Sequence, residues 1–175
     1  ARIDAKLTTP GALDNAGGVT TLLLLADLLQ DYAGDPGVEI FIVNGEDHYS
    51  AAGETDYLKR NQGKLSEIRL NINLDGAGYR QGSTAYSLYG VPDEMAAQIR
   101  QCFATQPGLV EGELWYQGDH MIFFQNGVPA MAITSGEMAP LWAEIAHTAD
   151  DLPDLVEPAR LATMARALQA LLPTL

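Results

Sequence analysis

The chain alternates short apolar runs with longer segments in which apolar residues recur every three or four positions. Residues 38–43 form an apolar, β-branched run between glycine and asparagine, and residues 68–74 alternate apolar and polar side chains. Both patterns predict strands. Further strands are expected at 85–89, 114–116 and 130–134. Helices are expected at 19–29, 51–60, 92–104, 121–125, 138–146 and 158–172, the last with a clear amphipathic spacing.

Strands that alternate with helices predict an α/β fold, a three-layer αβα sandwich around a mostly parallel mixed sheet. A chain of 175 residues with 47% hydrophobic residues is long enough for one domain with a substantial core. The chain begins directly at Ala1-Arg2-Ile3-Asp4. We therefore expect that an N-terminal part of a longer protein precedes it.

The formal net charge of −13 argues against nucleic acid or an anionic membrane surface as a partner. No apolar run is long enough to cross a bilayer, and no basic leader opens the chain, so we expect a cytoplasmic location. The single cysteine, Cys102, cannot form an internal disulfide and is expected to be a buried thiol. Nothing in the sequence indicates the oligomeric state.

Acidic residues follow the predicted strands. Glu46 and Asp47 come after 38–43, Asp75 comes after 68–74, and Asp14 precedes the first long helix. In open α/β sheets, ligands bind beyond the carboxyl ends of the strands. Converging carboxylates need a cation, and carboxylate with imidazole, such as His147, suits zinc. Considered separately, Asp14 is typical of a helix cap, and Glu46-Asp47 of a surface turn.

Other catalytic chemistries have little support in the sequence. No G-x-S-x-G elbow or Walker motif is present, and Gly76-Ala77-Gly78 lacks the third glycine of a dinucleotide fingerprint. Cys102 has no neighbouring base in the sequence. A hydrolase built on Ser135 is supported only by the presence of suitable residue types.

Taken in order, the motifs resemble the dizinc exopeptidase family, which includes bacterial leucyl aminopeptidases and glutaminyl cyclases. The resemblance covers essentially the whole chain and implies one metallopeptidase-like catalytic domain over residues 1–175, with the zinc-exopeptidase (phosphorylase-like) fold and peptide substrates. The matching motifs are Pro10 to Gly18, Asn44 to Asp47, Asn73 to Gly78, Gly118-Asp119-His120, Gly127 to Ala130 and His147 to Asp151.

The resemblance also implies roles for individual residues. Asp14 would bridge two zinc ions, Asp47 and His147 would complete one zinc site, and Asp75 would serve the other. Glu46 would be the general base that takes a proton from the attacking water. Asp119 and His120 would lie beside the metal pocket, in a segment where Gly118 replaces the family's serine.

One departure from the family pattern concerns the second zinc. The family has His-x-Asp where this chain has Arg2-Ile3-Asp4, with the histidine as a ligand and the aspartate, here Asp4, orienting it. A guanidinium has no lone pair for a metal. We therefore expect one or two zinc ions and an aminopeptidase whose second site is weakened by Arg2. Two alternatives stay open: a catalytically impaired, peptidase-like binding domain, and a glutaminyl-cyclase-like acyltransferase with one zinc.

Several ring side chains have an ordinary explanation. His48 and His120 are expected to be hydrogen-bonded or surface imidazoles, because His147 already fits the ligand role. Trp115, Tyr116 and Phe123 are expected to pack in the core.

Overall fold

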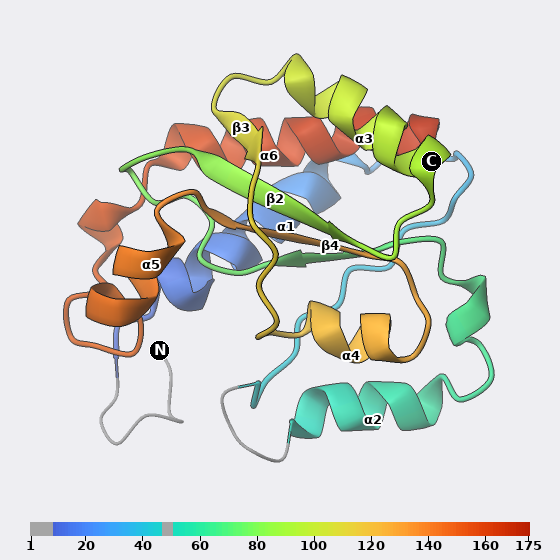
Figure 1. Ribbon diagram of the computed structural model, residues 1–175, viewed down its shortest axis with the longest axis horizontal. Coiled ribbons are helices and arrows are strands. Elements are labelled where there is room, and N and C mark those ends of the chain that lie inside the picture. The colour runs from blue at the N-terminus through green and yellow to red at the C-terminus, as the bar shows by residue number, and fades with distance from the viewer. Residues whose placement is uncertain (1–8, 47–50) are drawn as a thin grey trace.

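The computed structural model describes residues 9–46 and 51–175 and has an open, four-stranded mixed sheet at its centre (Figure 1). The strand order is β1-β4-β2-β3. The β1–β4 and β2–β3 pairs are parallel, and the β2–β4 pair is antiparallel. This arrangement confirms the predicted α/β class. The strands are β1 (Asn71–Leu74), β2 (Thr84–Tyr89), β3 (Leu109–Glu111) and β4 (Ala130–Ser135).

Helices cover both faces of the sheet and complete the three predicted layers. Figure 1 shows α1, α3 and α6 on one side of the sheet and α2 and α4 on the other. A short helix, α5 (Met138–Pro140), continues as a helical turn over Leu141–Ile145. The longer helices are α1 (Gly17–Leu28), α2 (Ala52–Arg60), α3 (Asp93–Ala104), α4 (His120–Gln125) and α6 (Pro158–Leu171).

The main core lies between the sheet and the layer of α1, α3 and α6. The inward face of α6 buries Leu161, Met164 and Leu168, as its amphipathic spacing predicts. Tyr86 of β2 meets Phe103 of α3 edge to face, with ring centroids 5.0 Å apart. Each large apolar side chain buried in this layer contributes roughly 1.5–3 kcal/mol relative to an exposed one. This core holds the strands whose carboxyl ends lead to the candidate site.

Two predicted strands are absent from the described residues. Residues 37–45 have no strand assignment despite their β-branched composition, and the side chains of Val38 and Ile42 are 39% and 53% exposed. A strand needs a hydrogen-bonded neighbour, and this segment has none in a ladder. Residues 114–116 also form no strand, because the Tyr89 hydroxyl, rather than a neighbouring strand, binds the N–H and C=O of Trp115.

The remaining expectations concern Cys102 and the membrane. Cys102 is half-buried rather than fully buried, and its Sγ lies 3.9 Å from the carbonyl oxygen of Ala167. Burial raises the pKa of its thiol, which disfavours the reactive thiolate. Within the described ranges, no helix is long and apolar enough to span a bilayer.

Candidate active site

Asp14 lies in a tight turn, Ala12–Ala16, immediately before α1, and its side chain is fully buried. Its backbone angles (φ −121°, ψ 84°) are not helical, and the peptide bond to Asn15 is cis. The carboxylate Oδ2 lies 3.1 Å from Nε2 of His147, a half-exposed imidazole. The interpretation of Asp14 as a helix cap is therefore wrong. Instead, Asn15 accepts a hydrogen bond from the Gly18 N–H and donates one to the carbonyl of Leu74.

Asp151 fixes the backbone on which Asp14 sits. Its buried carboxylate accepts the N–H of Leu13 at 2.7 Å and the N–H of Asp14 at 3.1 Å. Its own carbonyl accepts the N–H of Ala12 at 3.2 Å. Sequence reasoning placed Asp151 only at the end of the motif that begins at His147. Its four-residue distance from a candidate ligand was the only signal of this supporting role.

Two glycines allow the first turn of α1 to approach the end of β1. A Cβ on Gly17 would lie 2.7 Å from the carbonyl oxygen of Ala77, and one on Gly18 would lie 2.6 Å from that of Leu74. Real Cβ atoms do not come this close to backbone oxygen, so any larger residue would push the two elements apart. The Gly17-Gly18 pair therefore brings the Asp14 turn close to the strand that ends at Asp75.

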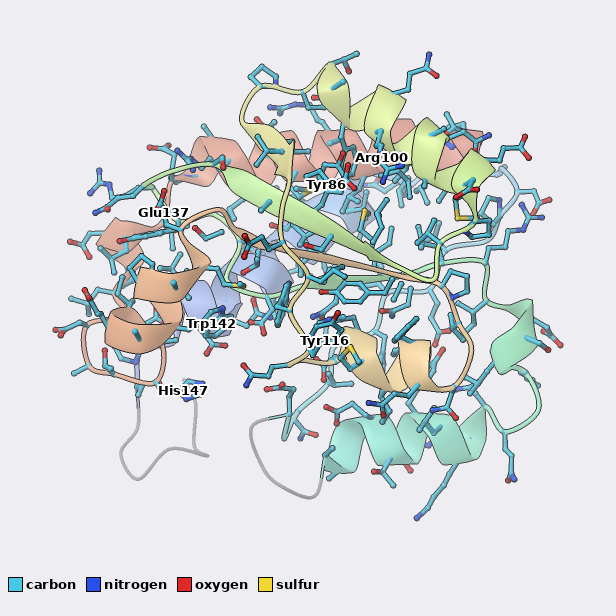
Figure 2. The ribbon with its side chains drawn as sticks, viewed as in Figure 1. Tyr86, Arg100, Tyr116, Glu137, Trp142 and His147 are labelled. Carbon is cyan, nitrogen blue, oxygen red and sulfur yellow. The ribbon has the colours of Figure 1, made fainter. Side chains whose placement is uncertain are left out.

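Glu46, Asp75 and His147 line one cavity of about 310 Å³. Asp75 follows the last residue of β1 and is buried, as expected for a polar group at a strand's carboxyl end. His147 has a positive φ of 64°, a region that histidine enters more often than most residues. Figure 2 shows His147 and Trp142 on the same side of the molecule, near α5. The rest of the cavity wall consists of Trp115, Gln117, Gly118 and Trp142.

Four residues that the sequence singled out, Arg2, Asp4, Asp47 and His48, lie outside the described residues. The predicted roles of Arg2, Asp4 and Asp47 stay predictions. Within residues 9–46 and 51–175, no three His, Cys, Asp or Glu side chains are grouped closely enough to hold a metal ion by themselves. The structure therefore brings Asp14 to His147, and His147 to Glu46 and Asp75, without a complete ligand set.

The chemistry of these side chains nevertheless fits zinc. A fully buried carboxylate is costly unless a positive charge compensates it, and His147 supplies one only when it is protonated. A neutral imidazole and carboxylate oxygens are ordinary zinc ligands. A cation between Asp14 and the cavity wall would compensate the burial of Asp14 and agree with the surplus of acidic groups around it.

A second acidic pair lies next to this region. Glu54 of α2 is buried, and its carboxyl group is hydrogen-bonded to that of Asp119, the residue before α4. Burial, followed by this hydrogen bond and the charges of Glu54, Glu46 and Asp75, raises the pKa of Asp119 to about 9. Asp119 is therefore protonated at neutral pH and can donate a hydrogen bond as a neutral acid.

His120 is fully buried, and its Nε2 lies 3.0 Å from the carbonyl oxygen of Trp115. Its ring also packs against the rings of Tyr89 and Trp115, each with centroids 4.6 Å away. Burial lowers the pKa of His120, so the imidazole is neutral at physiological pH. The expectation of a hydrogen-bonded, structural imidazole agrees with these contacts.

The aromatic residues have different environments. Phe123 is buried, as expected for a core residue, but Tyr116 is 64% exposed, so its predicted core role is wrong. Trp115 is buried and also lines the cavity, 6.2 Å from Trp142 between ring centroids. Trp142 was not singled out in the sequence. No local signal marked it, because α5 and the turn after it bring this ring to the cavity only in the folded chain.

Comparison with known proteins decides the family. The model of peptidase family M28 matches residues 1–172. The chain belongs to peptidase family M28. Among curated M28-like relatives, the aminopeptidase YwaD of Bacillus subtilis is 26% identical over 171 residues, which are 92% of this chain and 37% of that protein.

Solved structures share the fold at low sequence identity. The structure described as BSAP, a zinc aminopeptidase from Bacillus subtilis, matches with a TM-score of 0.74 and 19% identity, over 93% of this chain and 42% of that one. The LapA aminopeptidase of Legionella pneumophila matches with a TM-score of 0.73 and 14% identity, over 93% and 46%. This M28 chain therefore spans less than half the length of these relatives, and the likeness establishes the fold.

Proposed function

We propose that this M28 chain carries the catalytic centre of a zinc-dependent aminopeptidase, which removes N-terminal residues from peptides. One observation carries the proposal: the fully buried carboxylate of Asp14 contacts His147, which lines the same cavity as Glu46 and Asp75. The names of the relatives support the same activity, since YwaD is an aminopeptidase and BSAP a zinc aminopeptidase.

In this proposal, Asp14, Asp47 and His147 hold one zinc ion, and Asp75 serves a second position. Bound zinc acts as a Lewis acid that polarises the peptide carbonyl and makes water more acidic. Glu46, at the cavity wall, takes the proton from the attacking water and passes it to the leaving amine. Because Arg2 cannot coordinate metal, the second position binds zinc weakly, and one zinc is the main occupied state.

The cavity wall also proposes a preference among substrates. Trp115 and Trp142 present ring surfaces on the wall that carries Glu46 and Asp75. An apolar side chain at the peptide N-terminus would be removed from water against these rings, which favours binding by about 25 cal/mol per Å² of buried apolar area. We therefore expect leucyl or phenylalanyl substrates to be cleaved faster than aspartyl substrates.

Zinc content and hydrolysis of aminoacyl-p-nitroanilides test this function. The purified protein should bind zinc and hydrolyse the leucyl substrate, and removal of zinc with a chelator should abolish the rate. Glu46→Gln should lower kcat by roughly 10²–10⁴-fold, the usual contribution of a general base, without loss of zinc. Glu144→Gln, at an exposed position after α5, is the matched control and should retain the rate.

The same assays separate the alternatives. A protein that binds no zinc and hydrolyses none of the substrates contradicts the peptidase and supports a binding domain. Pyroglutamate formation from a peptide with N-terminal glutamine, without anilide hydrolysis, supports the acyltransferase instead. Arg2→His should increase the amount of bound zinc and the rate if Arg2 weakens the second position. Unchanged zinc content and rate would show that Arg2 does not limit the site.

A further inference from the structure

A larger cavity, of about 460 Å³, lies away from the catalytic residues and between two extended segments of chain. One wall consists of residues 67–74, which include β1, and the opposite wall consists of residues 35–43. Apolar side chains from α1 and α6, among them Leu25 and Leu168, form its floor. We call this cavity the β1 slot.

The first wall of the β1 slot is an edge strand. In the described sheet, β1 pairs with β4 on one side only. The N–H groups of Asn71 and Asp75 donate to carbonyls of the β4 segment. Because N–H groups alternate sides along a strand, those of Ile72 and Leu74 point away from β4 and toward the slot. An exposed edge of this kind is a template for another strand.

The second wall has strand character without a strand partner. Residues 38–43 are the apolar, β-branched run that predicts a strand, and the structure assigns no strand there. Ile40, Phe41 and Val43 line the slot. The physical reason for the missing assignment is visible in this arrangement: the cavity separates the segment from the edge of β1, the nearest strand with hydrogen-bonding groups directed toward it.

Both walls run in the same direction. β1 leads into Asp75 and residues 38–43 lead toward Glu46, and these two acidic residues line one smaller cavity. A single strand between the walls could therefore pair in parallel with both. The slot wall also holds polar atoms without hydrogen-bond partners, Oδ1 of Asn71 and Nδ2 of Asn73. Buried polar atoms of this kind are costly, which favours an occupant with polar groups rather than a purely apolar one.

We propose that the β1 slot receives one extended, apolar strand from polypeptide outside these 175 residues, hydrogen-bonded to β1 on one side and to residues 38–43 on the other. The size of the relatives supports this occupant: more than half of the chains of BSAP and LapA lie outside the matched region. β-Strand addition to an edge derives its affinity from main-chain hydrogen bonds and its selectivity from side-chain pockets. The inference concerns the sheet and does not depend on the proposed catalysis.

A peptide probe tests this proposal on the whole chain. The probe is a capped hexapeptide, Thr-Val-Ile-Val-Ile-Thr, and its control is the same peptide with alternate amide nitrogens methylated. Addition of the probe should slow amide hydrogen exchange at Ile72 and Leu74 by about tenfold or more, because these amides become hydrogen-bonded. The methylated peptide should leave their exchange unchanged, since it lacks the donors for one ladder.

Two variants locate the binding. Ile40→Asp places a charge in the slot and should abolish the protection by the probe. Val110→Asp, on β3 at the opposite edge of the sheet, is the matched control and should retain it.

Four results would overturn the proposal. These are unchanged exchange at Ile72 and Leu74, protection confined to the β3 edge, equal protection by the methylated peptide, and a dimer whose slot amides are protected without any peptide. The last result would identify a second copy of the chain as the occupant.

Discussion

Nε2 of His147 lies 3.1 Å from Oδ2 of Asp14, although one residue follows α5 and the other precedes α1. Asp14 is fully buried and His147 is half-exposed, so the carboxylate depends on this part of the cavity for compensation of its charge. The pair defines the point at which zinc is proposed to bind.

Replacement of Asp14 by asparagine keeps the shape of the side chain and removes its charge. Asp14→Asn should weaken zinc binding by more than the roughly 10- to 100-fold typical of residues that only support metal ligands. Competition with a chromophoric chelator measures this affinity. Asp150→Asn, at an exposed position in the same loop as His147, is the control. Equal zinc affinity of Asp14→Asn and the unaltered protein would remove Asp14 from the ligand set.

The carboxylate of Asp151 accepts two backbone N–H groups in a buried setting. In Asp151→Asn, an amide NH₂ faces one of these donors, so that a buried N–H loses its acceptor. The free energy of unfolding should fall by about 1–3 kcal/mol. Urea denaturation checks this, with Asp154→Asn at an exposed position as the control. A change smaller than that of the control would show that the turn holds its geometry without Asp151.

Gly18 allows α1 to approach the end of β1. Gly18→Ala would bring a Cβ within 2.6 Å of the carbonyl oxygen of Leu74 and into the side chain of Asn15. The resulting shift should cost about 1–3 kcal/mol of stability, the usual range for overpacking. Gly37→Ala is the matched control, because a Cβ there meets nothing within 4 Å. Thermal unfolding of both variants gives the comparison, and a Gly18→Ala protein as stable as Gly37→Ala would contradict the prediction.

Asp119 makes stability depend on pH. Its folded-state pKa is about 9, well above the ordinary value of 3.8. Between these values the folded state binds a proton that the unfolded state has released, so stability should fall as the pH rises through this range. The zinc-free protein should therefore unfold at a lower temperature at pH 9 than at about pH 5.

Asp119→Asn should reduce this dependence, because the amide does not titrate. Asp31→Asn, at an exposed position after α1, should leave it unchanged. Thermal unfolding across the pH range is the measurement. An identical pH profile in Asp119→Asn and the unaltered protein would show that Asp119 is ionised in the fold.

Local sequence pattern determined the elements whose stability comes from burial of one face. The 3.6-residue spacing of α6 and the apolar run of β4 were sufficient, because each pattern permits only one way to bury its apolar side chains. Residues 38–43 have an equally clear strand pattern and form no strand, because strand formation depends on a partner that lies elsewhere. The pattern in this case reports what the segment can do and not what surrounds it.

The candidate site divides along the same line. The sequence by itself placed Asp14, Glu46, Asp75 and His147 at element ends, where polar groups collect, and its ordered motifs pointed to the family. Only the tertiary structure showed that Asp14 is not a helix cap, that Asp151 holds its backbone and that Trp142 lines the cavity. Backbone hydrogen bonds and burial between distant segments decide these relationships, and such contacts leave no regular period in the sequence.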